Sequence, residues 1–276
     1  MEKASNFVVA AHKLPKVSIL IASFNRLPAL KRAIKSALQQ DYSAKEIVII
    51  DDGSEKESQV FLERLASLSK FINVYFQKNQ GPAAARASGV EKSTGDFICI
   101  LDSDDVLRKN AVSSVMHIFL NNEDMELVHV NNRKIFKNKI MGVSRYPQKE
   151  NQSRFVRHIF LSPIVPFKHS GMTFRRKTMI SLGNYDVQLA RKVDIDIFLR
   201  FLTNGKKIKL LEDPPLVDFI QNTGSISRSR IIGIRCWFKI IDKYEQRIIF
   251  RTLYKSLRTG SELGKMLVEM IRYKNN

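Results

Sequence analysis

The first half of the chain alternates between short apolar runs and amphipathic segments, and this alternation limits the folds it can adopt. Four runs have the β-branched and aliphatic composition of strands: residues 17–21, 46–50, 72–76 and 97–101. Segments with helical spacing of apolar residues follow them, as with Leu30, Ile34 and Leu38. Strands that alternate with helices predict an α/β fold, a parallel sheet with helices on both faces.

The remaining elements are predicted less regularly. Helices are expected after the four strands, at about 30–38, 60–68, 81–93 and 111–120. The second half predicts strands at 127–130, 133–140, 171–174 and 208–211, helices at 175–182 and 194–202, and a polar loop at 141–152.

Polar side chains follow three of the first four strands where each strand ends. Ser23 and Asn25 follow the first strand, Asp51 and Asp52 close the second, and Asp102 and Asp104 follow the fourth. Ligands of parallel α/β sheets bind outside the carboxyl ends of the strands. We therefore expect these side chains to converge on one edge of the sheet and to form a site.

The sequence Asp102-Ser103-Asp104-Asp105 places three carboxylates directly after a buried strand. Adjacent anions repel, and one compensation is a divalent cation, since Mg²⁺ and Mn²⁺ prefer carboxylate oxygens. The alternative is that Asp104 or Asp105 caps a helix that starts near Val106 while the other carboxylates are solvated. The strand-end convergence favours a site.

Composition excludes some classes of protein and leaves others open. No apolar run approaches the roughly 20 residues of a membrane-spanning helix. The two cysteines, Cys99 and Cys236, form neither a disulfide framework nor a zinc spacing, which predicts a reducing cytoplasm. The net charge of +19 predicts an anionic partner: nucleic acid, anionic lipid or a phosphorylated ligand.

The C-terminal segment carries a large share of this charge. Residues 228–276 hold 12 basic and 4 acidic side chains, a net of +8. The pattern over 231–257 predicts an amphipathic helix with a slowly winding basic stripe: Arg235, Lys239, Lys243, Arg247, Arg251 and Lys255. Such a helix either lies on an anionic membrane surface with its apolar face down or packs on the preceding domain with a solvated basic face.

With these residues in view, the chain resembles family 2 glycosyltransferases of the GT-A fold. The resemblance runs through about residues 15–228 and rests on eight pieces in order: 15–26, 47–54, 79–86, 95–105, 174–176, 183–186, 194–200 and 224–227. It implies a Rossmann-like nucleotide-binding sheet and inverting transfer of a sugar from a nucleotide sugar, typically a UDP-sugar, to an acceptor hydroxyl.

The resemblance also implies roles for individual residues. Asp104 would bind Mn²⁺ or Mg²⁺ with support from Asp102, and Asp194 would be the catalytic base. His169, Ser170 and Gly171 would line the acceptor side. The nucleotide-sugar donor would contact Ala22, Phe24, Asn25, Asp52, Arg86, Asp102 and Ser103.

Each role has a structural alternative. Asp52 could be a turn residue, Arg86 a solvated helix residue, and Asp194 the N-cap of the helix from Ile195. Two positions depart from the family pattern: Val193 stands where a Glu is usual before the base, and Asn222 stands where a His is often found.

These observations predict three segments: an N-terminal tail at 1–14, a catalytic domain at 15–228 and a basic amphipathic helical tail at 229–276. The catalytic domain would divide into a nucleotide-sugar half at 15–125 and an acceptor half at 126–228. The predicted function is transfer to a lipid-linked glycan of a bacterial surface polysaccharide, by a cytoplasmic enzyme peripheral on the inner face of the inner membrane. A metal-dependent nucleotidyltransferase and a basic nucleic-acid-binding protein are the alternatives, although no nucleic-acid motif is found.

Overall fold

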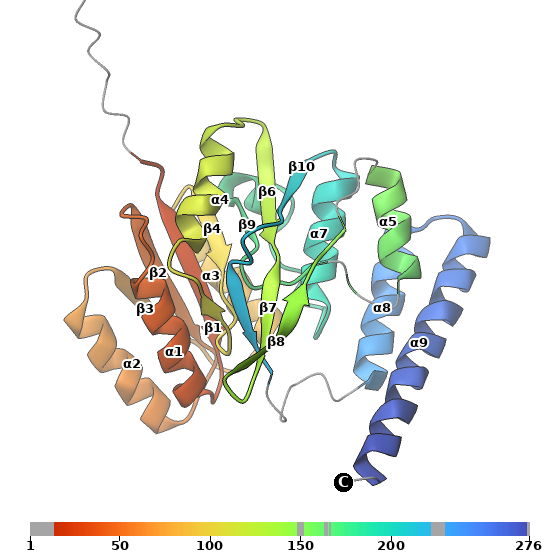
Figure 1. Cartoon of the computed structure of the whole chain (residues 1–276), viewed down its shortest axis with the longest axis horizontal. Coiled ribbons are helices and arrows are strands. Elements are labelled where there is room, and N and C mark those ends of the chain that lie inside the picture. The colour runs from red at the N-terminus through yellow and green to blue at the C-terminus, as the bar shows by residue number, and fades with distance from the viewer. Residues whose placement is uncertain (1–13, 148–151, 163–164, 166, 222–229, 275–276) are drawn as a thin grey trace, which may run out of the picture.

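The computed structural model describes residues 14–147, 152–162, 165, 167–221 and 230–274 (Figure 1). Its strands are β1 (Val17–Ser23), β2 (Lys45–Asp51), β3 (Ile72–Phe76), β4 (Phe97–Ile100), β5 (Val106–Leu107), β6 (Met125–Val130), β7 (Asn132–Phe136), β8 (Lys139–Ser144), β9 (Thr173–Arg175), β10 (Lys207–Leu211) and β11 (Val217–Ile220). Its helices are α1 (Leu27–Leu38), α2 (Lys56–Leu68), α3 (Pro82–Lys92), α4 (Ala111–Leu120), α5 (Gln152–Leu161), α6 (Arg176–Ser181), α7 (Val193–Thr203), α8 (Arg230–Tyr244) and α9 (Ile248–Lys274).

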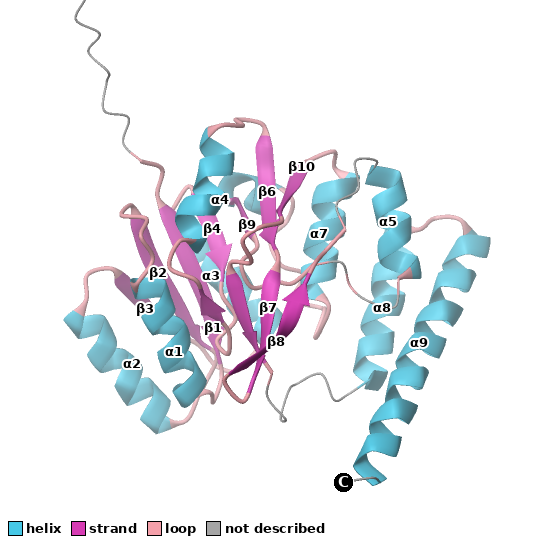
Figure 2. Ribbon diagram, viewed as in Figure 1, coloured by secondary structure: helices cyan, strands magenta, loops and turns pink. Residues whose placement is uncertain are grey.

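A seven-stranded sheet forms the centre of the molecule, in the order β10-β6-β9-β4-β1-β2-β3. The first four predicted strands are confirmed and pair in parallel, β4 with β1, β1 with β2 and β2 with β3. The expectation of a parallel sheet is wrong for β9, which runs antiparallel between β4 and β6. A second sheet of four short strands, β5-β11-β7-β8, lies beside it (Figure 2).

The two faces of the large sheet bury two separate hydrophobic cores. Along β1, Leu20 belongs to one core, whereas Ile19 and Ile21 belong to the other. The first core continues into α3, α5, α7 and α8, and the second into α1 and α4. Because both faces are covered, the central strands are apolar at nearly every position, which explains their continuous runs in the sequence.

Three segments of the second half differ from their predictions. Residues 133–140 form a hairpin of β7 and β8, because Lys137 and Asn138 both adopt the left-handed conformation of a tight turn. The polar loop predicted at 141–152 is shorter, since β8 continues to Ser144. The helix expected near Val106 is the short strand β5, and the helix α4 begins only at Ala111.

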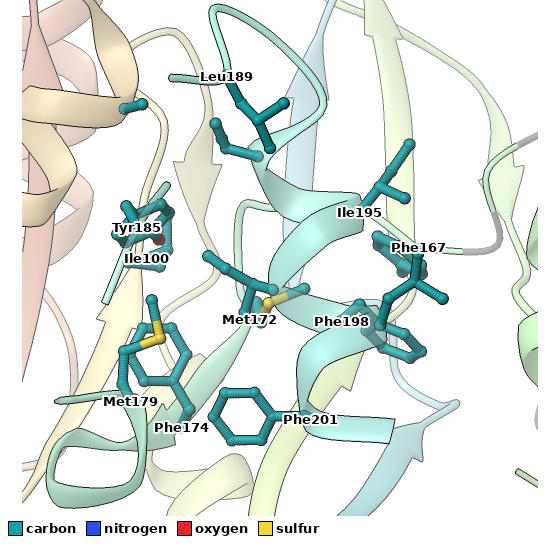
Figure 3. Packing of buried hydrophobic residues seen from close by; sticks show 14 of the residues in the cluster. Ile100, Phe167, Met172, Phe174, Met179, Tyr185, Leu189, Ile195, Phe198 and Phe201 are labelled. Carbon is teal, nitrogen blue, oxygen red and sulfur yellow. The ribbon is translucent and has the colours of Figure 1, made fainter. Parts of the chain in front are cut away.

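Helix α7 is held on the sheet by aromatic packing. The rings of Phe167 and Phe198 stack with centroids 4.1 Å apart, and the ring of His129 meets Phe198 edge-on at 5.1 Å. Figure 3 shows Phe198 and Phe201 of α7 in this layer, which reaches Phe174 of β9. The predicted helix at 194–202 is therefore confirmed, and its inward face fixes the first turn of α7 above the sheet.

The C-terminal segment forms two antiparallel helices in place of the single helix predicted at 231–257. The chain turns at Glu245, whose carboxylate accepts the backbone N–H of Arg247 at 3.0 Å. Helix α8 buries Trp237, Ile240 and Ile241 in the first core, and α9 lies along the outer edge of the molecule (Figure 1). No helix in the described part of the chain is long and apolar enough to cross a bilayer.

The basic stripe is largely paired with acidic groups of the protein itself. Lys243 donates to Asp196 at 2.7 Å, while Lys255 and Arg251 pair with Asp242. The stripe therefore holds the two helices to each other and to the catalytic domain. The packed alternative of the sequence prediction is the arrangement found, although its basic face is paired and not simply solvated.

Two buried histidines make the folded state sensitive to acid. Burial lowers the pKa of His129 to about 3 and that of His169 to about 4, compared with about 6.5 in an unfolded chain. Between these values the unfolded state binds more protons than the folded state, so the free energy of unfolding falls as the pH falls below about 6.5. Each histidine contributes a slope of about 1.4 kcal/mol per pH unit.

We expect the urea midpoint to drop steeply between pH 6.5 and 5 and to change little from pH 6.5 to 8. His129→Phe should reduce the slope of the free energy of unfolding against pH by the contribution of one proton, at most about 1.4 kcal/mol per pH unit. The exposed His117, replaced by Asn, is the control and should leave the slope unchanged. A slope in His129→Phe equal to that of the parent chain would contradict the assignment.

Candidate active site

The ends of β1 and β2 are joined by hydrogen bonds through Asn25. Its backbone N–H donates to the Ser54 hydroxyl at 2.9 Å, and its side-chain oxygen accepts the N–H of Glu55 at 2.8 Å. Asn25 adopts a left-handed backbone conformation, which asparagine tolerates better than most residues. Asn25 therefore holds the two loops together, while the neighbouring Phe24 exposes nearly half of its surface.

Asp52 organises the loop that leads into α3. Its carboxylate accepts the Gln77 side-chain amide at 2.7 Å and the backbone N–H groups of Gln80 and Gly81, both at 2.9 Å. A carboxylate offers about four acceptor positions, so three are used. The turn alternative does not describe Asp52, because its contacts reach another strand-to-helix loop. About one acceptor position is left on a side chain that is almost fully buried.

Asp102 is the carboxylate of the D-x-D sequence that faces a pocket. The Arg86 guanidinium of α3 donates to it at 2.6 Å, and His169 Nδ1 lies 3.7 Å away. Burial raises the pKa of Asp102, but Arg86 and His169 outweigh this effect and the net shift is downward. Asp102 therefore stays ionised, and Arg86 is its largely buried partner and not a solvated helix residue.

The other acidic residues of this motif have separate surroundings. Asp104 is partly exposed and forms an ion pair with Arg26 at the start of α1. Ser103 is buried. Asp105 is buried too, and burial next to Asp102 and Asp104 raises its pKa. Asp105 caps no helix: it accepts the backbone N–H of Ile220 at 3.2 Å and so joins β5 to β11.

His169, Ser170 and Gly171 support the end of β4. The Ser170 hydroxyl accepts the Asp102 N–H at 2.9 Å, and the Gly171 N–H donates to Ile100 at 2.8 Å. A side chain at Gly171 would meet Val130 and Val217 at 2.6 Å, so only glycine fits. His169 lies in the wall of the pocket described below, whereas Ser170 and Gly171 are buried and are not among the residues of that wall.

A pocket of about 600 Å³ brings Asp194 together with two of the predicted donor-side residues, Arg86 and Asp102. The other predicted residues of the donor and metal site are not in its wall: Ala22, Phe24, Asn25, Asp52, Ser103 and Asp104. Its wall includes Arg86, Asp102, His169 and Asp194. Asp194 lies in the first turn of α7, where the helix dipole favours a carboxylate. The N-cap alternative is wrong for Asp194, because Lys192 occupies that position in a left-handed conformation.

Asp196 faces the opposite way and anchors α7. Its buried carboxylate accepts Lys243 Nζ at 2.7 Å and the Tyr244 hydroxyl at 2.8 Å, and it pairs with Arg200 one turn further along α7. The spacing of two residues places Asp194 and Asp196 on different faces of the helix, as predicted. The C-terminal helix α8 thus positions the helix that carries Asp194.

Comparison with known proteins assigns the family. Residues 18–182, more than half of the chain, match the family described as Glycosyl transferase family 2. The chain belongs to this family. An uncharacterized glycosyltransferase of Haemophilus influenzae is 36% identical over 110 residues, which cover 40% of this chain and 44% of that protein. A GalNAc(5)-diNAcBac-PP-undecaprenol beta-1,3-glucosyltransferase of Campylobacter jejuni is 33% identical over 105 residues, covering 37% of this chain and 34% of the relative.

Solved structures show that this family 2 glycosyltransferase has the GT-A fold. The structure of residues 1–349 of S. aureus TarS in complex with UDP-GlcNAc matches with a TM-score of 0.67 at 15% identity, over 90% of this chain and 73% of that one. At this identity the likeness concerns the fold alone. The alignments to the two curated relatives span less than half of each relative's length.

Several pocket residues of this glycosyltransferase were not predicted. Tyr146, whose hydroxyl accepts the Asn132 amide at 2.5 Å, lies in the segment predicted as a polar loop. Lys192 adjoins the expected base, so proximity in the sequence was its only signal. No local motif marks the wall residues that come from the C-terminal helices: Arg230, Gly233, Glu262 and Lys265. The same holds for residues from β7, β11 and the loops, such as Lys134, Lys168 and Phe219. Asn222 and the 224–227 piece lie outside the described residues.

The residues present fit a divalent cation held jointly with a substrate. Among the described residues, no group of three or more His, Cys, Asp or Glu side chains gathers around a single point. Mg²⁺ characteristically binds through one or two carboxylates together with substrate phosphates and water. Asp102 and Asp104 provide that pair, and each now pairs with an arginine, Arg86 and Arg26 respectively.

Proposed function

We propose that this chain transfers a sugar from a nucleoside diphosphate sugar, a UDP-sugar by preference, to an acceptor hydroxyl with inversion at the anomeric carbon. The observation that carries this proposal is a pocket in which Asp194 shares a wall with Arg86 and Asp102. A carboxylate that can take a proton thus faces the groups suited to a diphosphate leaving group. Family membership favours sugar transfer over nucleotidyl transfer.

The reaction divides between the two ends of this pocket. Asp194 accepts the proton of the acceptor hydroxyl. At the same time the hydroxyl oxygen attacks the anomeric carbon from the face opposite the leaving group. The bond from that carbon to the diphosphate oxygen breaks, and the diphosphate leaves with the electron pair. Mn²⁺ or Mg²⁺ held by Asp102 and Asp104 would neutralise diphosphate charge. Arg86 adds a fixed positive charge at the same end.

The loops at the ends of β1 and β2 suit the nucleoside. Phe24 offers an exposed aromatic face for stacking on the base. The remaining acceptor position of Asp52 suits the N–H of uracil. A panel of nucleotide sugars with Mn²⁺ and Mg²⁺, scored for binding and for hydrolysis, tests both donor and metal. Release of nucleoside diphosphate supports the proposal, and release of pyrophosphate contradicts it.

The acceptor proposed here is a lipid-linked glycan at the inner face of a bacterial inner membrane. The name of the Campylobacter jejuni relative specifies an undecaprenol-linked acceptor. The outward face of α9 also supports membrane contact: it exposes Ile249, Leu253, Leu257 and Leu263, while Tyr254, Arg258 and Glu262 of the same helix point inward. A chain with a net charge of +19 is attracted to anionic lipid, which favours a membrane as the occupant of this face.

We expect the chain to sediment with vesicles that contain anionic lipid, and Ile249→Asp with Leu253→Asp to weaken this binding at least about tenfold, since two apolar side chains are lost from the interface. The matched control is Val60→Asp with Leu68→Asp, which changes two exposed apolar residues of α2. Equal loss in both double variants, or a stable dimer in solution that covers α9, would contradict the assignment.

A further inference from the structure

A lysine of the pocket wall, Lys168, has no role in the reaction proposed above. It stands between the buried Phe167 and the buried His169, in the segment that leads into β9. The Phe167 ring stacks on Phe198 of α7 with centroids 4.1 Å apart, and His169 Nε2 forms a hydrogen bond with the Tyr185 hydroxyl at 2.8 Å. Packing thus fixes both neighbours, and with them the backbone from which the Lys168 side chain enters the wall.

The ring of Phe219 holds the other end of this side chain. Lys168 Nζ lies 4.1 Å from the centre of the ring, within the range of a favourable cation–π contact. Phe219 is itself placed by the pairing of β11 with β7, in which it stands opposite Lys134. An aromatic face attracts a cation and limits its motion, but it leaves the positive charge of the ammonium intact. The ammonium is therefore positioned before any substrate binds.

The ammonium of Lys168 is available to an anionic ligand. In the part of the chain that the structure describes, Lys168 forms no ion pair with a carboxylate. Its side chain is partly exposed in the pocket wall, so a ligand can reach it. An ammonium offers three N–H donors, and charge-assisted hydrogen bonds to phosphate oxygens are among the strong ones.

Lys168 lies at the end of the pocket that holds Asp102. Burial raises the pKa of Asp102, whereas Arg86 and His169 lower it. Lys168 lowers it as well, so its ammonium is close enough to act on the charge of Asp102. Arg86 is already engaged within the protein, since it donates to Asp102 at 2.6 Å and to the Pro82 carbonyl at 3.2 Å. A diphosphate at this end would therefore meet, in Lys168, a cation whose donors the described residues leave unused.

We propose that Lys168 is a further catalytic residue, whose ammonium donates hydrogen bonds to the phosphate oxygens of the donor's leaving diphosphate. As the bond from the anomeric carbon to the diphosphate oxygen breaks, the electron pair stays on that oxygen and its negative charge grows. A fixed ammonium stabilises this growing charge more than it stabilises the bound donor, and it gives up no proton in doing so. The catalytic role rests on the proposed function, whereas the affinity of this site for a diphosphate can be measured without it.

Pyrophosphate is the probe that tests the site without a sugar or a base. Calorimetric titration in EDTA, at constant ionic strength, should show saturable binding to the parent chain. Lys168→Gln should weaken this binding about tenfold, through the loss of one charge-assisted contact, and Lys168→Arg should stay within about threefold of the parent because it keeps the charge. Rescue by Lys168→Arg separates the loss of charge from a loss of folding.

The matched control is another lysine that lies over a phenylalanine ring. Lys31 Nζ lies 4.8 Å from the centre of the Phe61 ring, and neither residue is in the pocket wall. Lys31→Gln should therefore leave pyrophosphate binding unchanged. The absence of saturable pyrophosphate binding to the parent chain, or equal affinities of Lys168→Gln and Lys31→Gln, would overturn the proposal.

A second arm separates the diphosphate of the donor from that of a lipid-linked acceptor. The ratio of the affinities for UDP and for uridine measures what the diphosphate contributes to donor binding. Lys168→Gln should lower this ratio about tenfold, leave uridine affinity within about twofold, and lower kcat at saturating donor at least about tenfold. Weaker pyrophosphate binding with an unchanged ratio would assign Lys168 to the acceptor and overturn the proposal. If no nucleotide binds, the proposed function fails, and the pyrophosphate titration still decides whether Lys168 holds a diphosphate.

Discussion

Replacement of Asp194 by Asn is expected to lower kcat by about 10²–10⁴-fold and to leave donor affinity within about twofold. Asn keeps the shape of the side chain but cannot accept the proton of the acceptor hydroxyl. Asp194 also lies in the first turn of α7 with its neighbours fixed by packing, so the substitution should not displace the helix. The measurement is steady-state transfer together with calorimetric titration of UDP.

The control for this experiment is Asp124→Asn. Asp124 is an exposed carboxylate that pairs with Lys207 and does not belong to the pocket wall. This variant should retain full activity and the melting temperature of the parent chain. Turnover by Asp194→Asn at more than about a tenth of the parent rate would remove Asp194 from the role of base.

The second large effect is expected on kcat/KM when the carboxylates of the D-x-D sequence are removed. Asp104→Asn should lower kcat/KM at least about 100-fold, equivalent to about 2.7 kcal/mol of transition-state stabilisation. Asp102→Asn should do the same and in addition leave the Arg86 guanidinium without the negative charge that it now pairs with at 2.6 Å. Mn²⁺ binding, followed by electron paramagnetic resonance with UDP present, should weaken in both variants.

Arg26 makes this experiment sharper. Its guanidinium pairs with Asp104, so a cation that binds Asp104 competes with it. Arg26→Gln should therefore tighten Mn²⁺ binding, in the direction opposite to Asp104→Asn. The matched control for the two Asp→Asn variants is Asp41→Asn, on the exposed loop after α1, which should leave Mn²⁺ binding unchanged. Metal affinity that is unchanged in Asp102→Asn and Asp104→Asn would contradict a metal site here.

The donor half of the site was predictable because it depends on local pattern and on the direction of parallel strands. Buried runs identify β1, β2 and β4, and the polar residues that follow them must meet at one edge. What the pattern could not supply is the exact partner of each carboxylate. Asp52 holds the loop before α3, and Asp105 joins β5 to β11, because chain segments distant in sequence come together there.

The short elements of the second half were harder to predict because tertiary pairing decides them. β5 has two residues and exists only because β11 pairs with it. β9 has three, and it enters the sheet antiparallel between β4 and β6. Segments of this length carry too little periodicity to distinguish a strand from a loop.

The sequence by itself determined the α/β class, the strand-end carboxylates and the helix that carries Asp194. Only the tertiary structure decided which face of the C-terminal helices turns inward. An amphipathic helix can bury either face, and the choice depends on what it meets. Here the buried carboxylate of Asp196 pairs with Lys243 of α8, and α9 turns Arg258 and Glu262 inward. Charge complementarity thus directs the paired cations toward the protein, and Leu253 and its apolar neighbours face outward.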